Sequence, residues 1–210
     1  MDSRQKVVLN VLRRIQRFLD EHSGVLSSVN RTRARIALDD LVFSAELAEG
    51  AQRRAAARSK RLTAQRKALR RQLRAAHLRP IIAFARAKGE VLPVLSCMGM
   101  PSKDAPDLEL MIAARAIATM AVQKQRVFLD EGFPLDFVER LVAAIAAMEA
   151  AESECSRCRM EGRRATVILA DLIKRGRGLS RVIDALVVAR IADNARLMAV
   201  WRAASSRKNH

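Results

Sequence analysis

Apolar residues recur every three or four positions through most of the chain, the spacing that puts them on one face of an α-helix. Ser3 can cap a first helix that continues to about Glu21. The apolar face of this helix consists of Val7, Val8, Val11, Leu12, Ile15, Phe18 and Leu19. We expect the helix to break at His22–Gly24, where the apolar spacing stops.

A second helix is predicted from Ser27 or Ser28, and it continues either unbroken or with a bend at Gly50. Its expected core positions are Ile36, Leu38, Leu41, Val42 and Leu47. Arg79-Pro80 is predicted to end it, because a residue before proline is pushed out of the helical region. A short helix, 81–87, follows, and then a connector at 89–107 that contains Gly89, Pro93, Gly99, Pro101 and Pro106.

Asp107 can cap the next helix, 108 to about 131, which Gly132 stops. Pro134 then opens a helix that reaches Arg175, with an interruption left open at Gly162. Gly176 and Gly178 are predicted to end it, and Ser180 to cap a last helix to about Ala204.

These patterns predict an all-α fold, a bundle of five to six helices that includes two long helices in antiparallel hairpins. Helices of this length commonly pair as coiled coils. We divide the chain into an N-terminal hairpin with a basic arm (1–88), a Pro/Gly linker (89–107) and a C-terminal three-helix part (108–210), packed as one unit.

Two short motifs repeat at an offset of 110 residues. Phe18-Leu19-Asp20-Glu21 recurs as 128–131, and Arg53-Arg54-Ala55 recurs as 163–165. One hypothesis is a duplicated helical hairpin, in which the helix lengths of the two halves correspond. The other is chance agreement in a chain rich in Ala and Arg.

The segment between Gly50 and Gly89 is strongly basic. These forty residues contain thirteen Lys or Arg and no Asp or Glu, in a chain whose formal net charge is +17. On a helix the apolar stripe is narrow, and it consists of Ala51, Ala55, Leu62, Leu69, Leu73 and Ala76. The positions opposite are Arg53, Lys60, Lys67, Arg71 and Arg74. No acidic residue one turn away offsets their repulsion.

A concentrated positive surface favours a polyanion, and most plausibly DNA or RNA held through backbone phosphates with little sequence preference. The candidate nucleic-acid-binding residues are Arg53, Arg54, Lys60, Arg61, Arg66, Lys67, Arg70, Arg71, Arg74, His77 and Arg79. With six Phe, one Trp and no Tyr, the chain offers few rings for base stacking. The competing interpretation is a solvated face that the chain's own carboxylates neutralise, although the total charge leaves an excess.

Other partners are compatible with the same pattern. The alternative function is a structural or adaptor bundle that binds an acidic protein or self-associates. We do not expect a membrane partner, because the apolar stripes have the width of bundle contacts. Three cysteines and a charged N-terminal segment favour the cytoplasm.

No arrangement of residues predicts catalysis or a cofactor. Cys155 and Cys158 have the C-x-x-C spacing of a zinc site, but only Cys97 and three His could complete it. We interpret the two cysteines as small packing residues. Phosphate-cradling and di-iron motifs are missing. His77 either contacts phosphate, acts as an acid or base, or packs at a helix end.

Several stretches resemble a group of bacterial all-helical proteins with no established activity. They are Val11–Asp20, Gln65–Arg70, His77-Leu78-Arg79-Pro80-Ile81, Phe133–Phe137 and the segment around Leu186 and Trp201. The match extends end to end, and its most specific part is the H-x-R-P-I corner, where the group's pattern leads us to expect Met instead of Leu78. The resemblance implies an all-α fold and carries over no catalytic residue.

Overall fold

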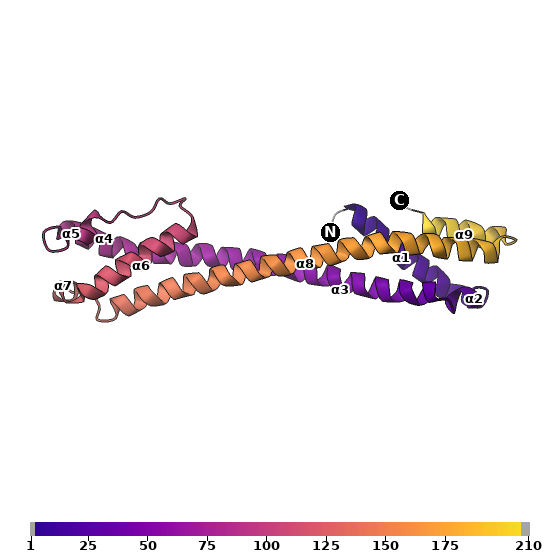
Figure 1. Cartoon of the computed structure of the whole chain (residues 1–210), viewed down its shortest axis with the longest axis horizontal. Coiled ribbons are helices and arrows are strands. Elements are labelled where there is room, and N and C mark those ends of the chain that lie inside the picture. The colour runs from indigo at the N-terminus through magenta and orange to yellow at the C-terminus, as the bar shows by residue number, and fades with distance from the viewer. Residues whose placement is uncertain (1–2, 207–210) are drawn as a thin grey trace. The chain divides into compact units, whose positions relative to one another are not determined.

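The structure, a computed structural model, describes the backbone of residues 3–206 and the side chains of residues 5–206 (Figure 1). Every regular element in that range is helical, which confirms the all-α prediction. In chain order the helices are α1 (Ser3–Glu21), α2 (Ser27–Asn30), α3 (Arg33–Gln72), the π-helix η1 (Leu73–Leu78), α4 (Arg79–Ala87), α5 (Pro93–Cys97), α6 (Asp107–Gln123), α7 (Gln125–Asp130), α8 (Phe137–Ile191) and α9 (Ala195–Ser205). None of these helices combines the length and the apolar character needed to cross a lipid bilayer.

The chain forms two compact units, which differ from the division at 88 and 107 that we expected. Unit 1 comprises Met1–Ala57 and Arg159–His210, and unit 2 comprises Arg58–Cys158. The long helices α3 and α8 each contribute to both units. We describe each unit by itself.

Unit 1 has a core built from α1, the first half of α3, the second half of α8, and α9. Leu9, Leu12 and Leu19 of α1 are fully buried in it. Trp201 of α9 packs its ring 5.1 Å from that of Phe18 and donates its indole N–H to Asp184 at 2.7 Å. The large side chains of α1 and α9 thus pack together with the α3 and α8 segments in one core.

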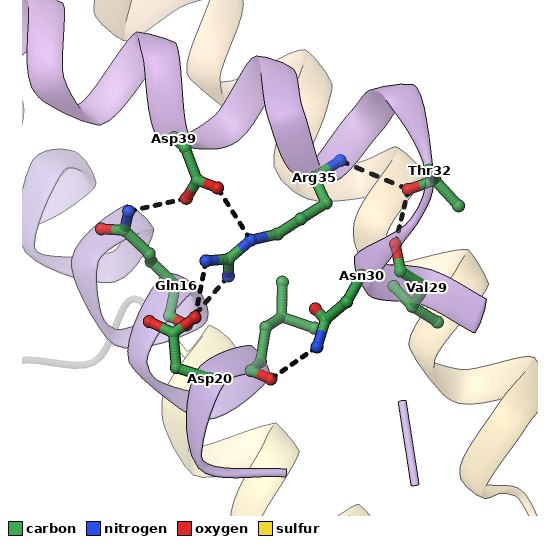
Figure 2. A network of polar contacts seen from close by, with 8 residues as sticks. Gln16, Asp20, Val29, Asn30, Thr32, Arg35 and Asp39 are labelled. Carbon is green, nitrogen blue, oxygen red and sulfur yellow. Dashed lines mark hydrogen bonds and ion pairs between the residues drawn. The ribbon is translucent and has the colours of Figure 1, made fainter. Parts of the chain in front are cut away.

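A polar network joins the end of α1 to the start of α3 in unit 1 (Figure 2). The buried guanidinium of Arg35 donates to Asp20 at 2.6 Å, to Asp39 at 3.0 Å and to the Gln16 carbonyl at 3.1 Å. The Thr32 hydroxyl accepts the Arg35 backbone N–H and so caps α3. Arg35 is therefore committed to internal carboxylates and is not a free cation.

Unit 2 gathers η1, α4, α5, α6, α7 and the first half of α8 around a second core. Four phenylalanines form a cluster there, with ring centroids 4.9–5.3 Å apart. They are Phe84, Phe128, Phe133 and Phe137. Rings at these distances add favourable edge and offset contacts to the burial of apolar area.

Within each unit the α3 and α8 segments pack antiparallel. In unit 1, Leu41 of α3 lies beside Gly176 of α8. Fourteen residues further along α3, Ala55 lies beside Gly162, which comes fourteen residues before Gly176 in α8. In unit 2, Leu62 packs with Cys155 and Cys158. Small residues at these positions let the two backbones approach closely. This arrangement confirms the two long paired helices of the predicted fold.

Several boundaries agree with the sequence prediction. Helix α1 spans Ser3–Glu21, although the side chain of the predicted cap, Ser3, lies outside the described part. The turn at Gly132, whose φ is +88°, separates α7 from α8 as predicted. Helix α3 passes through Gly50 without a break, which settles the alternative left open there.

Some predicted core positions were wrong. Ile36 and Leu47 are 59% and 56% exposed, and Ala76 is also exposed. The neighbours of α3 cover only the side that carries Leu38, Leu41 and Val42. Hydrophobicity alone could not identify which of two apolar stripes on the helix would meet a neighbour.

The predicted corner at Arg79-Pro80 was also wrong, because the chain does not reverse there. The helix continues from α3 through η1 into α4, and the Arg79 N–H bonds to the Arg74 carbonyl five residues earlier. Inside a regular α-helix, Pro80 would leave a carbonyl unpaired and its ring would clash with the preceding turn. One π turn changes the hydrogen-bond register and lets the proline stand within a continuous helix.

The predicted helix end at Gly176 and Gly178 was wrong as well. Helix α8 runs through both glycines and through Gly162, and Ser180 lies inside it with its hydroxyl donating to the Arg177 carbonyl. The break comes later, before α9, where Asn194 caps the helix by accepting the Leu197 N–H at 3.0 Å. Gly176 is buried against Leu12, so this glycine allows close packing between helices and does not end the helix.

The predicted linker, 89–107, contains one short helix, α5, and then follows an irregular path to α6. Asp107 begins α6 but makes no capping bond, because its carboxylate instead accepts a hydrogen bond from Arg70 and forms an ion pair with Arg66, both of α3. The predicted helix 108–131 is divided at Lys124 into α6 and α7. The structure places Pro134 just before α8, with its carbonyl accepting the Phe137 N–H.

The long helices of the two halves agree in length, as the duplication hypothesis expects, whereas the first helices do not, since α1 is continuous and its counterpart is divided into α6 and α7. Segments of 40, 6 and 9 residues run without a break from Arg33 to Ala87, which equals the 55 residues of α8. Phe18 and Phe128 each occupy the core of their own unit, and Ala55 and Ala165 are both buried. The bounds of the two long helices, however, correspond at an offset of 104 residues and not 110, so the Arg-Arg-Ala motif occupies a different position in each helix. The equal lengths support the duplication, whereas the displaced motif is what chance agreement would give.

Candidate anion-binding surface

The predicted nucleic-acid-binding residues fall in two places. Arg53 and Arg54 belong to unit 1, while the other nine lie on the second half of α3, on η1 and at the start of α4, all in unit 2. The nine are Lys60, Arg61, Arg66, Lys67, Arg70, Arg71, Arg74, His77 and Arg79. A single continuous helical path carries them, because the π turn replaces the expected corner.

Three of these arginines are paired with carboxylates of the same chain. Arg53 bonds to Glu49 at 2.6 Å. In unit 2, Arg66 bonds to Glu152 at 2.5 Å, and Arg66 and Arg70 share Asp107. The hydrogen bond that Arg66 donates to Glu152 raises the pKa of the Arg66 guanidinium. Each of these arginines is paired within its own unit, Arg53 in unit 1 and the other two in unit 2, and contributes little free charge to the surface.

Arg70 and Arg74 also fix the irregular segment that precedes α6. Arg70 donates to the Lys103 carbonyl at 2.9 Å and to the Ala105 carbonyl at 2.6 Å. Arg74 donates to the carbonyls of Ser102 at 3.1 Å and Pro101 at 2.8 Å. The two guanidinium groups therefore hold the irregular segment against the end of α3 and against η1. This arrangement places Lys103 beside the basic helix.

The remaining cations have no carboxylate within ion-pair distance in the described part of the chain. They are Arg54, Lys60, Arg61, Lys67, Arg71 and Arg79, and all are exposed. The competing interpretation was that the chain's own carboxylates neutralise this face. The structure shows such neutralisation for only some of the cations. Charge that the chain leaves unpaired is available to a partner from solution.

A groove of about 880 Å³ collects several of these side chains in unit 2. Its basic lining residues are Lys67, Arg70, Arg71, Arg74, Arg79 and Lys103, with Asp104 as the acidic residue of the lining. A smaller hollow of about 240 Å³ shares Arg74 and Arg79 and adds Arg86. We call the two together the basic groove. Phosphate groups fit such a lining because guanidinium and ammonium donors converge on them.

His77 lies beside the groove but faces a different cavity, also of about 240 Å³, which Arg140 of α8 lines as well. Burial lowers the pKa of His77 from 6.5, and the positive charge of Arg140 lowers it further. The imidazole is therefore neutral at physiological pH and adds no charge to the surface. The sequence grouped His77 with the arginines, and the structure separates it from them.

Titration of His77 tests this geometry. We expect Arg140→Gln to raise the pKa of His77, because one of its two causes of depression disappears while burial remains. Because the folded pKa lies below 6.5, the neutral ring stabilises the fold above about pH 6.5. That contribution to the free energy of unfolding is lost as pH falls from 6.5 through the pKa of His77 in the folded protein.

Nuclear magnetic resonance of the histidine side chains measures the shift directly. Arg126→Gln is the matched control, since Arg126 is exposed in unit 2 and is not among the charges that act on His77. An unchanged His77 titration in Arg140→Gln would contradict the placement of the two side chains.

Sequence reasoning missed three residues of this region, Arg86, Lys103 and Arg140. Arg86 belongs to the charge run between Gly50 and Gly89 but was not among the candidates, whereas Lys103 and Arg140 lie outside the run and the local sequence does not indicate that they join it. Cys155 and Cys158 are buried against Leu62, and in residues 3–206 no group of three His, Cys, Asp or Glu side chains is arranged to hold a metal ion. No family model, curated protein or solved structure matches this chain.

Proposed function

We propose that unit 2 binds nucleic acid through the phosphate backbone, with little sequence preference, along the basic groove. The observation that supports this proposal is the exposed set Lys67, Arg71, Arg79 and Lys103, which lines one groove and has no carboxylate partner among the residues that the structure describes. Internal pairing cannot remove the excess, because 39 basic residues face 22 acidic ones. Long basic side chains in one groove contact phosphates irrespective of the base sequence.

The test is the salt dependence of binding to a fluorescent random-sequence duplex. With about four phosphate contacts, the logarithm of the affinity should fall with the logarithm of salt concentration with a slope of roughly −3.6. Between 50 and 200 mM salt this amounts to a loss of about two orders of magnitude. No binding at 50 mM, or binding insensitive to salt, would exclude the proposal.

A second candidate function is a helical adaptor that binds an acidic protein or self-associates. Ile36, Phe43 and Leu47 favour it, because they share one face of α3 in unit 1 and are 56–63% exposed. Separate apolar side chains are common on surfaces, but an aligned set on one helix is typical of a protein contact. A stable dimer in light scattering, together with no affinity for the duplex at 50 mM salt, would favour this function.

A further inference from the structure

The cavity beside His77 has one wall from the π turn and another from the start of α8. Ala76, His77 and Pro80 form the first wall, while Phe133, Phe137 and Arg140 belong to the second. Its volume of about 240 Å³ is below the roughly 300 Å³ at which pockets for drug-sized ligands begin. The space therefore suits a single ring system.

The chemistry of the lining favours a neutral occupant over an anion. Arg140 is paired with Asp136 at 2.7 Å, and this partner offsets part of its positive charge. His77 is uncharged at neutral pH and adds no positive charge to the cavity. The walls are otherwise aromatic or aliphatic, while the imidazole nitrogens and the remaining guanidinium N–H groups supply hydrogen-bonding atoms. A flat heterocycle with donors and acceptors on its edge matches this combination.

The cavity adjoins the basic groove along the same helix. Ala75 and Arg79 line the groove, and the residues that follow each of them, Ala76 and Pro80, line the cavity. Because consecutive residues of a helix point about 100° apart, the two sites lie on neighbouring sides of the same helical segment. A polymer whose phosphates lie in the groove would have its bases within reach of the cavity.

We propose that this cavity receives one unpaired base of a single-stranded nucleic acid whose phosphates lie in the basic groove. The inference rests on the proposed function and adds to it a contact that only a strand with accessible bases can make. The base would pack against the exposed side of the phenylalanine cluster, with its edge toward His77 and Arg140. Stacking on aromatic side chains tolerates all four bases, so the site adds affinity without sequence preference.

The test compares an intact single-stranded 12-mer with a fully abasic 12-mer of the same length and charge. Since stacking of a base contributes about 1–3 kcal/mol, the wild-type protein should bind the intact strand roughly 5- to 150-fold more tightly. Both strands should show the same salt dependence, because their phosphates are identical.

Ala76→Leu provides the decisive variant, because Ala76 is exposed and lines the cavity, so a larger side chain fills the space without removing a contact. We expect it to abolish the preference for the intact strand and to leave the abasic affinity unchanged. Ala68→Leu, at an exposed position of α3 in unit 2, is the matched control and should keep the preference. Phe133→Leu, which removes one ring and keeps an apolar side chain, should reduce the preference independently.

The possible failures are distinguishable. Equal, salt-dependent binding of both strands by the wild-type protein would overturn the base site and leave the proposed function standing. A preference that survives Ala76→Leu would place the base elsewhere and equally overturn the inference. If neither strand binds at 50 mM salt, both the proposed function and the base site are wrong.

Discussion

Replacing Lys67, Arg71, Arg79 and Lys103 by Gln should weaken nucleic-acid binding at least about a hundredfold at 50 mM salt. The four side chains line the basic groove, are exposed, and have no carboxylate partner within the described part of the chain. Each lost phosphate contact should flatten the salt dependence by about one unit of slope. Titration of a labelled duplex at several salt concentrations measures both quantities.

A control variant with the same change in net charge distinguishes the effect of the groove residues on affinity from the effect of total charge. Arg163, Arg164, Arg177 and Arg181 are exposed residues of α8 in unit 1, and their replacement by Gln also removes four of the +17 charges. This variant should retain most of the affinity and nearly all of the slope. If both variants lose affinity equally, general charge attraction and not the groove explains the binding.

The second large effect concerns the close packing at Gly176 in unit 1. A Cβ at this position would lie 2.6 Å from Cδ1 of Leu12 and 3.3 Å from Cδ2 of Leu41, both core side chains. Gly176→Leu should lower the free energy of unfolding by about 2 kcal/mol or more, since overpacking outweighs the better helix propensity of leucine. Urea denaturation followed by circular dichroism measures the change.

Gly178→Leu is the matched control, two residues further along the same helix. Apart from the neighbouring backbone of its own helix, no atom of the described residues lies within 4 Å of a Cβ at Gly178, which is exposed, so leucine meets no obstacle there. Because glycine is a poor helix former, this change should raise the free energy of unfolding by about 0.5–1 kcal/mol. If both substitutions were stabilising, the close contact between α8 and α1 would be wrong.

Local signals were sufficient for the first helix and for the turns that break the apolar spacing. Helix α1 spans the predicted residues because its apolar face is unambiguous, and Gly132 marks a turn because its positive φ favours glycine. The charge run between Gly50 and Gly89 likewise identified Lys67, Arg71 and Arg79 as candidates. Each of these conclusions needs only residues within about one or two helical turns of one another.

Conclusions that depend on distant residues could not be reached in this way. Gly176 and Pro80 each resemble a helix end in isolation, yet one packs against Leu12 and the other is accommodated by the π turn. The pairing of Arg66 with Glu152 joins residues that are 86 positions apart. Nothing in the run of cations indicated which would be neutralised and which would stay exposed.

The sequence by itself determined that this protein is helical, where most of its helices lie, and that one segment carries an unbalanced positive charge. Helix propensity, apolar spacing and net charge are local or additive properties, so they can be read without coordinates. The tertiary structure decided which arginines are internally paired, how Lys103 joins the groove and where the cavity beside His77 forms. These features require side chains from separate helices to meet, and only packing brings them together.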